Sequence, residues 1–173
     1  YKMAGFDYER STDAAVSFRG MELRGDIFNS MTNAVSIGME KIDPATDHKP
    51  GGRPRPSVTC CINLMLDFEN CVIEGRISAS RAKHRVTIVN PDNREELGVI
   101  ENTPAPAVNN GVLADMRGVR WTVTGDCYLT GLALDGDTVI SAPEGRRVVM
   151  TVNGAETVPE AGRYTGDICL RVI

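Results

Sequence analysis

A five-residue pattern recurs along the chain: an apolar residue, any residue, glycine, any residue, and a second apolar residue. It occurs at residues 23–27, 73–77, 123–127, 129–133 and 164–168. Alternation with a period of two is typical of a β-strand and places the apolar residues and the glycine on one face. A strand type that repeats along a chain predicts a stacked architecture, because each unit buries its face only against its neighbours. We therefore expect these glycines to face inward and to serve packing.

Short strands are predicted through the first two thirds of the chain, since no segment keeps the apolar spacing of a helix for three turns. The predicted strands are Ala14–Phe18, Met21–Phe28, Ala34–Met39, Val58–Leu66, Phe68–Ser78 and Val86–Val89. Asn70 falls where the chain is expected to turn. Residues 42–56 and 90–110 are predicted to be projecting loops, because prolines and turn-forming residues interrupt both segments.

From Val112 to Ile173 the sequence alternates almost continuously between strand and turn signals. Asn153-Gly154 fits a two-residue hairpin, because both central positions of such a turn need a positive φ. We expect this end of the chain to form a small antiparallel cap over the last open unit of the stack. An uncovered edge strand would otherwise invite aggregation.

Composition narrows the class of protein without assigning a function. The chain has 173 residues, of which 42% are hydrophobic and 24% are charged, as in a single globular domain with a core. The net charge of −4 gives no electrostatic case for a nucleic-acid partner. No apolar run approaches the roughly 20 residues that a membrane helix needs, so we expect no direct membrane insertion. The first residue is Tyr1, and we interpret the chain as part of a longer polypeptide.

The five cysteines are predicted to be structural. They are Cys60, Cys61, Cys71, Cys127 and Cys169. They form no Cys-x-x-Cys pair and have no histidine nearby, so a zinc site is disfavoured, and their odd number argues against a complete disulfide framework. Those in strand patterns are expected to act as small buried apolar residues, with Cys127 in the inward position that Ile27 and Ile77 hold elsewhere. A single disulfide stays open if two cysteines stack on adjacent units.

Several longer motifs resemble a known group of proteins. They are WTVTGDCYLTGL at 121–132, APEG at 142–145, MTVNG at 150–154 and AGRYTGDI at 161–168. Together they resemble the carboxy-terminal region of large secreted or surface-attached, adhesin-like β-helix proteins of Gram-positive anaerobic bacteria. Residues 68–78 and 107–111 are similar to upstream units of the same proteins, so the resemblance spans most of residues 15–173. The chain carries arginines where the units of that family are rich in Thr, Ser and Gly.

The resemblance implies an all-β fold, a right-handed parallel β-helix or solenoid with irregular loops and a C-terminal cap. It also implies an extracellular or cell-surface location and brings no catalytic residues. Residues 1–173 would then form one domain. The alternative fold is a β-sandwich of pilin or immunoglobulin type, suggested by the alternating final strand at 162–172.

Four acids are the candidates for catalysis, because β-helix folds also host polysaccharide lyases and hydrolases. They are Asp26, Glu74, Asp126 and Asp167, each within one residue of a motif glycine. Strands in a stack lie about 4.8 Å apart, so stacked acids would reach the roughly 5–10 Å separation that glycoside hydrolysis uses. The favoured interpretation of these four acids is solvated surface charge. Whether the chain is an enzyme stays open, and a noncatalytic chain is the favoured prediction.

The remaining candidates concern binding. Arg81, Lys83, His84 and Arg85 form a basic cluster for an anionic glycan or partner, although such clusters are usually solvated. Asp135 and Asp137 offer carboxylates to calcium, but a simple turn is favoured. Trp121 is expected in the core rather than against a sugar. No glycine-rich phosphate loop occurs, and we expect no cofactor.

The leading hypothesis is a noncatalytic structural or adhesive module of a bacterial secreted or cell-surface protein. Its partners would be the rest of the parent polypeptide or a surface glycan or protein. The first alternative is a carbohydrate-active enzyme or a subunit of one. The second alternative is a pilus-type subunit, which would adopt the sandwich fold.

Overall fold

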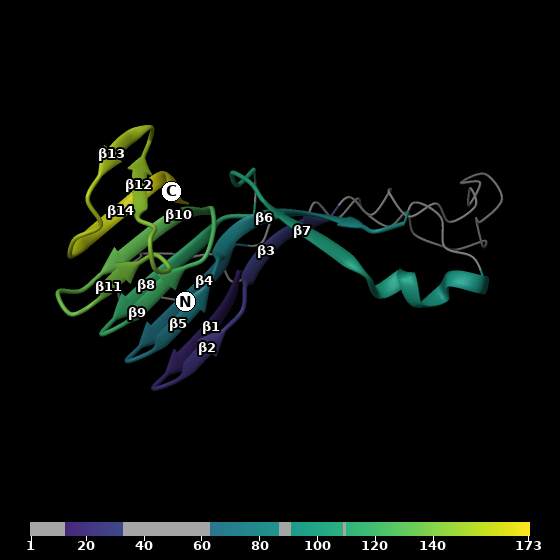
Figure 1. Ribbon diagram of the computed structural model, residues 1–173, viewed down its shortest axis with the longest axis horizontal. Coiled ribbons are helices and arrows are strands. Elements are labelled where there is room, and N and C mark those ends of the chain that lie inside the picture. The colour runs from purple at the N-terminus through teal and green to yellow at the C-terminus, as the bar shows by residue number, and fades with distance from the viewer. Residues whose placement is uncertain (1–12, 33–62, 87–90, 109) are drawn as a thin grey trace, which may run out of the picture.

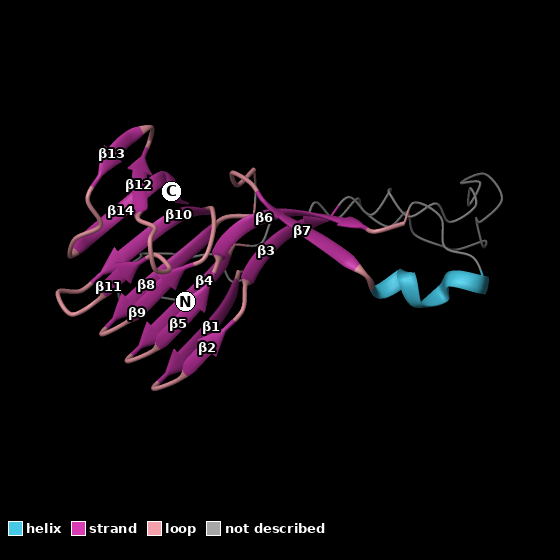
Figure 2. Cartoon of the chain, viewed as in Figure 1, coloured by secondary structure: helices cyan, strands magenta, loops and turns pink. Residues whose placement is uncertain are grey.

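The computed structural model describes residues 13–32, 63–86, 91–108 and 110–173. Strands dominate these residues (Figure 2), which confirms the prediction of an all-β chain. The strands of the first two thirds are β1 (Ala14–Arg19), β2 (Glu22–Arg24), β3 (Ile27–Thr32), β4 (Leu64–Glu69), β5 (Val72–Gly75), β6 (Ile77–His84) and β7 (Ile100–Pro104). Those that follow are β8 (Val112–Arg117), β9 (Arg120–Val123), β10 (Cys127–Leu134), β11 (Val139–Ser141), β12 (Val148–Val152), β13 (Ala155–Thr157) and β14 (Gly162–Val172). A 3-10 helix, η2, spans Pro91–Gly98.

The strands belong to three sheets, with the orders β1-β4-β8-β10-β14-β12-β13, β2-β5-β9-β11 and β3-β6-β7. Consecutive strands enter the three sheets in turn, so β1, β2 and β3 form one tier and β4, β5 and β6 form the next (Figure 1). The third tier consists of β8, β9 and the start of β10, which lies against β6. There the backbone N–H of Tyr128 donates to Ser78 Oγ at 2.9 Å.

Corresponding strands of successive tiers pair in parallel and in a constant register. Ala14 pairs with Leu64 and Ile27 pairs with Ile77, so the first two tiers are 50 residues apart. The pairings of β4 with β8 and of β5 with β9 are also parallel. The constant register places side chains of the same parity above one another. These parallel ladders do not fit the alternative of an immunoglobulin-type sandwich, whose sheets are antiparallel.

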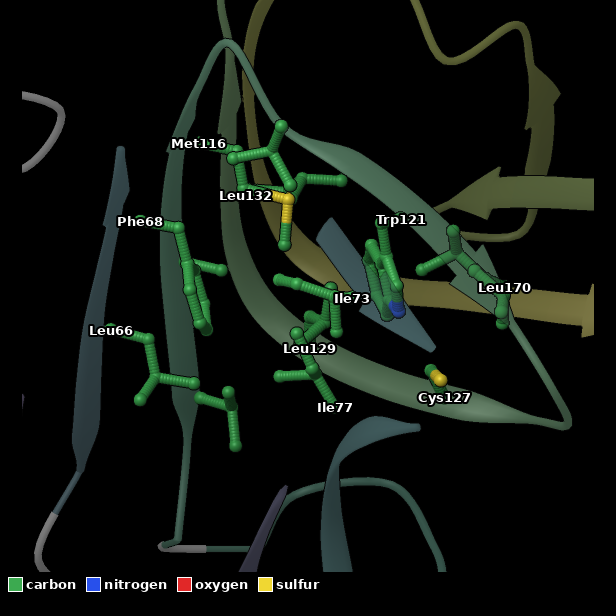
Figure 3. Close-up of a cluster of buried hydrophobic side chains, with 14 of the residues drawn as sticks. Leu66, Phe68, Ile73, Ile77, Met116, Trp121, Cys127, Leu129, Leu132 and Leu170 are labelled. Atoms are coloured by element: carbon green, nitrogen blue, oxygen red, sulfur yellow. The ribbon is translucent and has the colours of Figure 1, made fainter. Parts of the chain in front are cut away.

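The inward side chains of the three sheets make one apolar core (Figure 3). Phe68, Ile77 and Cys127 are each 0% exposed, and Trp121 lies among them. The indole Nε1–H of Trp121 donates to the carbonyl of Gly75 at 3.0 Å, which satisfies its polar atom inside the core. The predictions of a core tryptophan and of an inward Cys127 are therefore confirmed.

The corner between the first and second sheets needs a left-handed backbone conformation in every full tier. Gly20, Asn70 and Gly118 occupy it with φ values of 59°, 53° and 61°. Glycine and asparagine adopt this conformation at the lowest steric cost. The predicted turn at Asn70 is confirmed.

The first three copies of the recurring glycine pattern lie at corners between sheets. The prediction that each copy lies within a single strand is therefore wrong for these three. Gly25 lies between β2 and β3, and Gly125 lies between β9 and β10. The predicted strand Met21–Phe28 is consequently two strands, and Phe68–Ser78 is likewise divided. Gly25 is exposed rather than inward. A period of two continues across a short corner, so sequence alternation alone does not reveal the break.

The prediction of a loop at residues 90–110 is also wrong in part. Residues 91–98 form η2, and β7 pairs antiparallel with the second half of β6, with Ser80 opposite Pro104. In Figure 1 this β6–β7 arm extends away from the stacked tiers and carries η2 toward its far end. The prolines and asparagines of this segment are typical of a loop, so the sequence did not indicate β7, which pairs with the second half of β6. The predictions for residues 34–39 and 42–56 lie outside the described residues, as does most of the strand predicted at 86–89.

The predicted antiparallel cap is confirmed. Strand β14 pairs antiparallel with β10 and with β12, and β12 pairs antiparallel with β13. Asn153 and Gly154 join β12 to β13 with φ values of 50° and 84°, as a type I′ hairpin turn requires. Strand β14 of the cap covers the edge of β10, and the first sheet continues from there through β12 to β13.

Candidate functional site

Asp26 and Arg76 form the strongest polar contact at the corner between the second and third sheets. Arg76 lies in the tier above Asp26, and its backbone N–H donates to Asp26 Oδ1 at 2.8 Å. Its guanidinium donates to Asp26 Oδ2 through Nε at 3.1 Å and through Nη2 at 2.5 Å. The guanidinium carbon also lies 5.1 Å from the centroid of the Phe28 ring, within cation–π range.

This contact favours the ionised form of Asp26. The hydrogen bonds from the Arg76 side chain lower the pKa of the carboxyl group, although partial burial acts in the opposite direction. The same contact raises the pKa of Arg76. A catalytic acid would need the reverse shift, so this pair suits a structural clasp between two tiers better than proton transfer.

The register does not stack the four candidate acids on one another. Glu74 pairs with Arg24 below it and with Thr122 above it, and its carboxylate lies 4.0 Å from Arg24 Nε. Asp126 is exposed beside the third-tier corner, and Asp167 is exposed on β14 in the cap. The paired-carboxylate geometry that motivated these candidates is thus not formed by tier stacking.

Asp135 closes the first corner at the top of the stack. Its carboxylate accepts hydrogen bonds from Gly118 N–H at 3.0 Å, from Thr138 Oγ1 at 2.7 Å and from Asp137 N–H at 3.2 Å. Burial raises the pKa of Asp135, but the hydrogen bonds outweigh it and the pKa is lowered. Its oxygens are used in the turn, and the described residues contain no group of three or more metal-ligating side chains. The interpretation of Asp135 and Asp137 as a turn fits this geometry.

The basic cluster lies on β6 and just beyond it, in the β6–β7 arm. Lys83 Nζ lies 3.5 Å from a carboxylate oxygen of Glu101 on β7. Arg85 Nε donates to Glu96 of η2 at 2.9 Å, and this contact raises the pKa of Arg85 and lowers that of Glu96. Arg81 is exposed on the same strand, and His84 is its last residue. Two of the cluster's cations are therefore engaged in holding the arm together, which weakens the case for an anion site.

The described cysteines are free thiols. Cys71 and Cys127 are buried and Cys169 is half-buried, and none of the three is in a disulfide. Burial raises the pKa of Cys127 to about 12, far above the range of a reactive thiol. Their predicted role as small apolar residues is confirmed for Cys71 and Cys127.

A charge ladder on the outer face of the first sheet was not foreseen from the sequence. Arg117 Nη2 lies 2.5 Å from Asp67 Oδ1 and 3.8 Å from a carboxylate oxygen of Glu69 in the tier below. Arg19 lies 3.5 Å from the same glutamate on the other side. The sequence signal was a pair of charged residues spaced two apart in β4 and in β8, with the single charge of Arg19 in β1. Only the tier offset shows that opposite charges meet.

Among the hollows formed by the described residues, two lie at the cap, and neither brings the four candidate acids together. The smaller, of about 170 Å³, is lined by Pro106, Tyr128, Leu129, Thr151, Gly154, Asp167, Ile168, Cys169 and Arg171. Burial raises the pKa of Tyr128 there, and contact with Cys169 raises that of Arg171. The larger, of about 410 Å³, lies along β12 and is lined by Arg147, Val148, Val149, Met150, Glu156, Thr157, Val158 and Pro159.

Comparison of the chain with protein-family models, with curated proteins and with solved structures finds no match. Within the described residues, no helix has the length and apolar character needed to cross a membrane. The geometry of the chain itself therefore carries the functional argument.

Proposed function

We propose that this chain is a noncatalytic β-helix module, a structural or adhesive part of a bacterial secreted or cell-surface protein. The motifs at 121–132 and 161–168 and their resemblance to adhesin-like β-helix regions support the extracellular assignment. Parallel, in-register tiers and an antiparallel cap support the solenoid assignment. The role of such a module is to hold projecting segments, such as the β6–β7 arm, on a rigid stack.

The observation that carries this proposal is the difference between the two ends of the stack. Val16, Leu66 and Leu132 occupy one row of the first sheet, since Ala114 pairs with both Leu66 and Leu132. Leu66 is 1% exposed and Leu132 is 0% exposed, whereas Val16 at the other end is 41% exposed. The C-terminal end is thus covered, and the first tier leaves apolar surface open.

The open tier suits a partner that continues the stack. Within the described residues, β1, β2 and β3 are each paired on one side only, which leaves one backbone edge free in all three sheets. Solenoid proteins cover such edges with a further repeat or a cap, because open edges and apolar ends promote aggregation. The rest of the parent polypeptide is the partner that this geometry favours.

Adding a tier tests this role directly. A copy of Leu64–His84, fused ahead of Ala14 through a glycine- and serine-rich linker of about 30 residues, should pair with β1, β2 and β3. Burial of the open apolar row should raise the melting temperature by several degrees. Circular dichroism during thermal unfolding measures the shift. The control fusion carries serine in the copied positions of Leu66, Phe68 and Ile73, and equal melting temperatures for both fusions would contradict the proposal.

The absence of catalysis has its own test. We expect no release of reducing or unsaturated ends when the purified chain is incubated with a panel of pectic, chitinous and uronic-acid polysaccharides. Turnover that disappears in the double variant Asp26→Asn, Glu74→Gln would instead establish the carbohydrate-active enzyme. Turnover unaffected by that variant would also overturn the noncatalytic role but would exclude these two acids.

A further inference from the structure

The open side of β1 carries backbone groups of alternate residues along the whole strand. At one end, the N–H of Ala14 donates to the carbonyl of Asn63 in the second tier at 3.0 Å. At the other end, the N–H of Gly20 donates to the carbonyl of Glu69 at 2.8 Å. Successive residues of a parallel strand direct their backbone groups to opposite sides, so the residues between these face the open side, where no described strand pairs with them. They are Ala15, Ser17 and Arg19.

A row of side chains on the outer face of the first sheet alternates in charge from tier to tier. Arg19, Glu69 and Arg117 occupy this row in register. One carboxylate oxygen of Glu69 lies 3.5 Å from Arg19 Nη1 and 3.8 Å from Arg117 Nη2. The side chain of Arg19 is 68% exposed, against 34% for that of Arg117. Because opposite charges stabilise neighbouring positions and like charges repel, the row continues below Arg19 with an acid.

The corner next to this row alternates between glycine and asparagine. A Cβ atom at Gly118 would lie 2.6 Å from the amide oxygen of Asn70, so the Asn70 side chain uses the space that the glycine of the tier above leaves. A Cβ atom at Gly20 would meet nothing within 4 Å. The equivalent space beside Gly20 is therefore empty and has room for an asparagine amide from a tier below.

The core column beside the same corner is covered on one side only. The rings of Phe18 and Phe68 stack with centroids 5.1 Å apart and planes 10° apart, and Met116 continues the column in the third tier. Phe68 and Met116 are each 0% exposed, whereas Phe18 is half-buried. A large apolar residue below Phe18 would bury the remaining ring surface, which is favourable.

We infer that the unit which adds to the open first tier is of the same type as the second tier. Its strand runs parallel to β1 and ends in a large apolar residue, an acidic residue and asparagine. These three lie below Phe18, Arg19 and Gly20, in the register by which residues 68–70 lie below residues 116–118. Two types of tier then alternate along the stack. This inference rests on the proposed function, since the rest of the parent polypeptide is the source of the unit.

The fusion that carries a copy of Leu64–His84 ahead of Ala14 tests the charge row. The copied Glu69 lies below Arg19 in that fusion. Glu69→Lys in the copy alone should lower the melting temperature by about 2–4 °C, because an attractive pair becomes a repulsive one. In a fusion that also carries Arg19→Glu, the same Glu69→Lys change in the copy should instead raise the melting temperature. Circular dichroism during thermal unfolding measures all four proteins.

A methyl group at the corner tests the position of the asparagine. In the unfused chain, Gly20→Ala should lower the melting temperature only through its positive φ, since the space around it is open. In the fusion the methyl group meets the amide of the copied Asn70, so the loss should be larger by several degrees. Asn70→Gly in the copy keeps the left-handed conformation possible and should return the loss to its value in the unfused chain.

The outcomes separate this inference from the proposed function. A fusion that melts no higher than its serine control would contradict the continued stack and, with it, the type of tier that continues it. A fusion that melts higher, but in which Glu69→Lys in the copy has the same effect with Arg19 and with glutamate at that position, would overturn this inference alone. Equal losses from Gly20→Ala in the fused and unfused chains would likewise overturn only the asparagine corner.

Discussion

At the scale of single residues, several charged side chains in the described part of the chain have a partner of opposite charge in the neighbouring tier. Asp26 with Arg76 and Asp67 with Arg117 are separated by 50 residues in sequence and meet because the tiers stack in register. These contacts are partly exposed, so each is expected to contribute modestly to the free energy of unfolding. Because each of these contacts joins one tier to the next, together they can hold neighbouring tiers in register.

The Asp26–Arg76 contact predicts a pH dependence of stability. The folded-state pKa of Asp26 is lowered, first by the hydrogen bonds from Arg76. The stabilisation is therefore fully present above the unfolded value of about 3.9 and is lost as the pH falls through the lower folded value. Asp26→Asn should cost about 1 kcal/mol at pH 7, and the difference from the unmodified chain should shrink below pH 4. Urea unfolding at pH 7 and pH 3 measures this, with Asp126→Asn as the control. A difference that is independent of pH would contradict the assignment.

At the scale of elements, the strictest requirement for a particular residue type occurs at the corners between sheets and not within the strands. Gly75 ends β5 where the backbone of the tier below passes closest. A Cβ atom at Gly75 would lie 1.8 Å from the carbonyl oxygen of Gly25, whereas a Cβ atom at Gly25 would meet nothing within 4 Å. Both residues have a positive φ, of 155° and 124°. Both glycines are thus required by a positive φ, but only at Gly75 would a side chain also collide with the backbone of the tier below.

This pair of glycines gives a matched test of the corner. Gly75→Ala should lower the free energy of unfolding by about 3 kcal/mol or more, because backbone must move to relieve the overlap. Gly25→Ala should cost about 1 kcal/mol, from the unfavourable φ alone. Urea unfolding followed by circular dichroism measures both. Equal losses in the two variants would show that tier stacking does not impose the glycine at position 75.

At the scale of the whole molecule, the described tiers have a covered C-terminal end and a first tier that exposes apolar surface, and their centre is buried and apolar. Trp121, Phe68 and Cys127 lie in the middle tiers, each 0% exposed, with the cap on one side and the first tier on the other. Access of solvent to this centre therefore requires that the tiers separate.

Thiol labelling is expected to report this separation. Cys71 and Cys127 should resist iodoacetamide in the native chain, even at pH 9, because both are buried and the pKa of Cys127 is about 12. Cys169 is half-buried and should react first among these three. In 8 M urea all three should be labelled. Mass spectrometry of the digested protein measures each site, and rapid native labelling of Cys127 would contradict the packing of the core.

The sequence by itself determined the local structure that depends on neighbouring residues. Alternation predicted the strands, Asn70 predicted a turn, and Asn153-Gly154 predicted the hairpin of the cap. It also indicated that Trp121 and Cys127 would be buried, since apolar residues of one parity share a face. These features follow from short-range sterics and periodicity, which a sequence displays directly.

Only the tertiary structure decided which residues meet across tiers. The offsets of 50 and 48 residues place Arg76 over Asp26 and Thr122 over Glu74, so the acids that alternation made candidates are separated. The same packing turned an apparent in-strand glycine at position 75 into a corner. Long-range register is set by the summed packing of whole tiers, and no single segment of sequence carries that information.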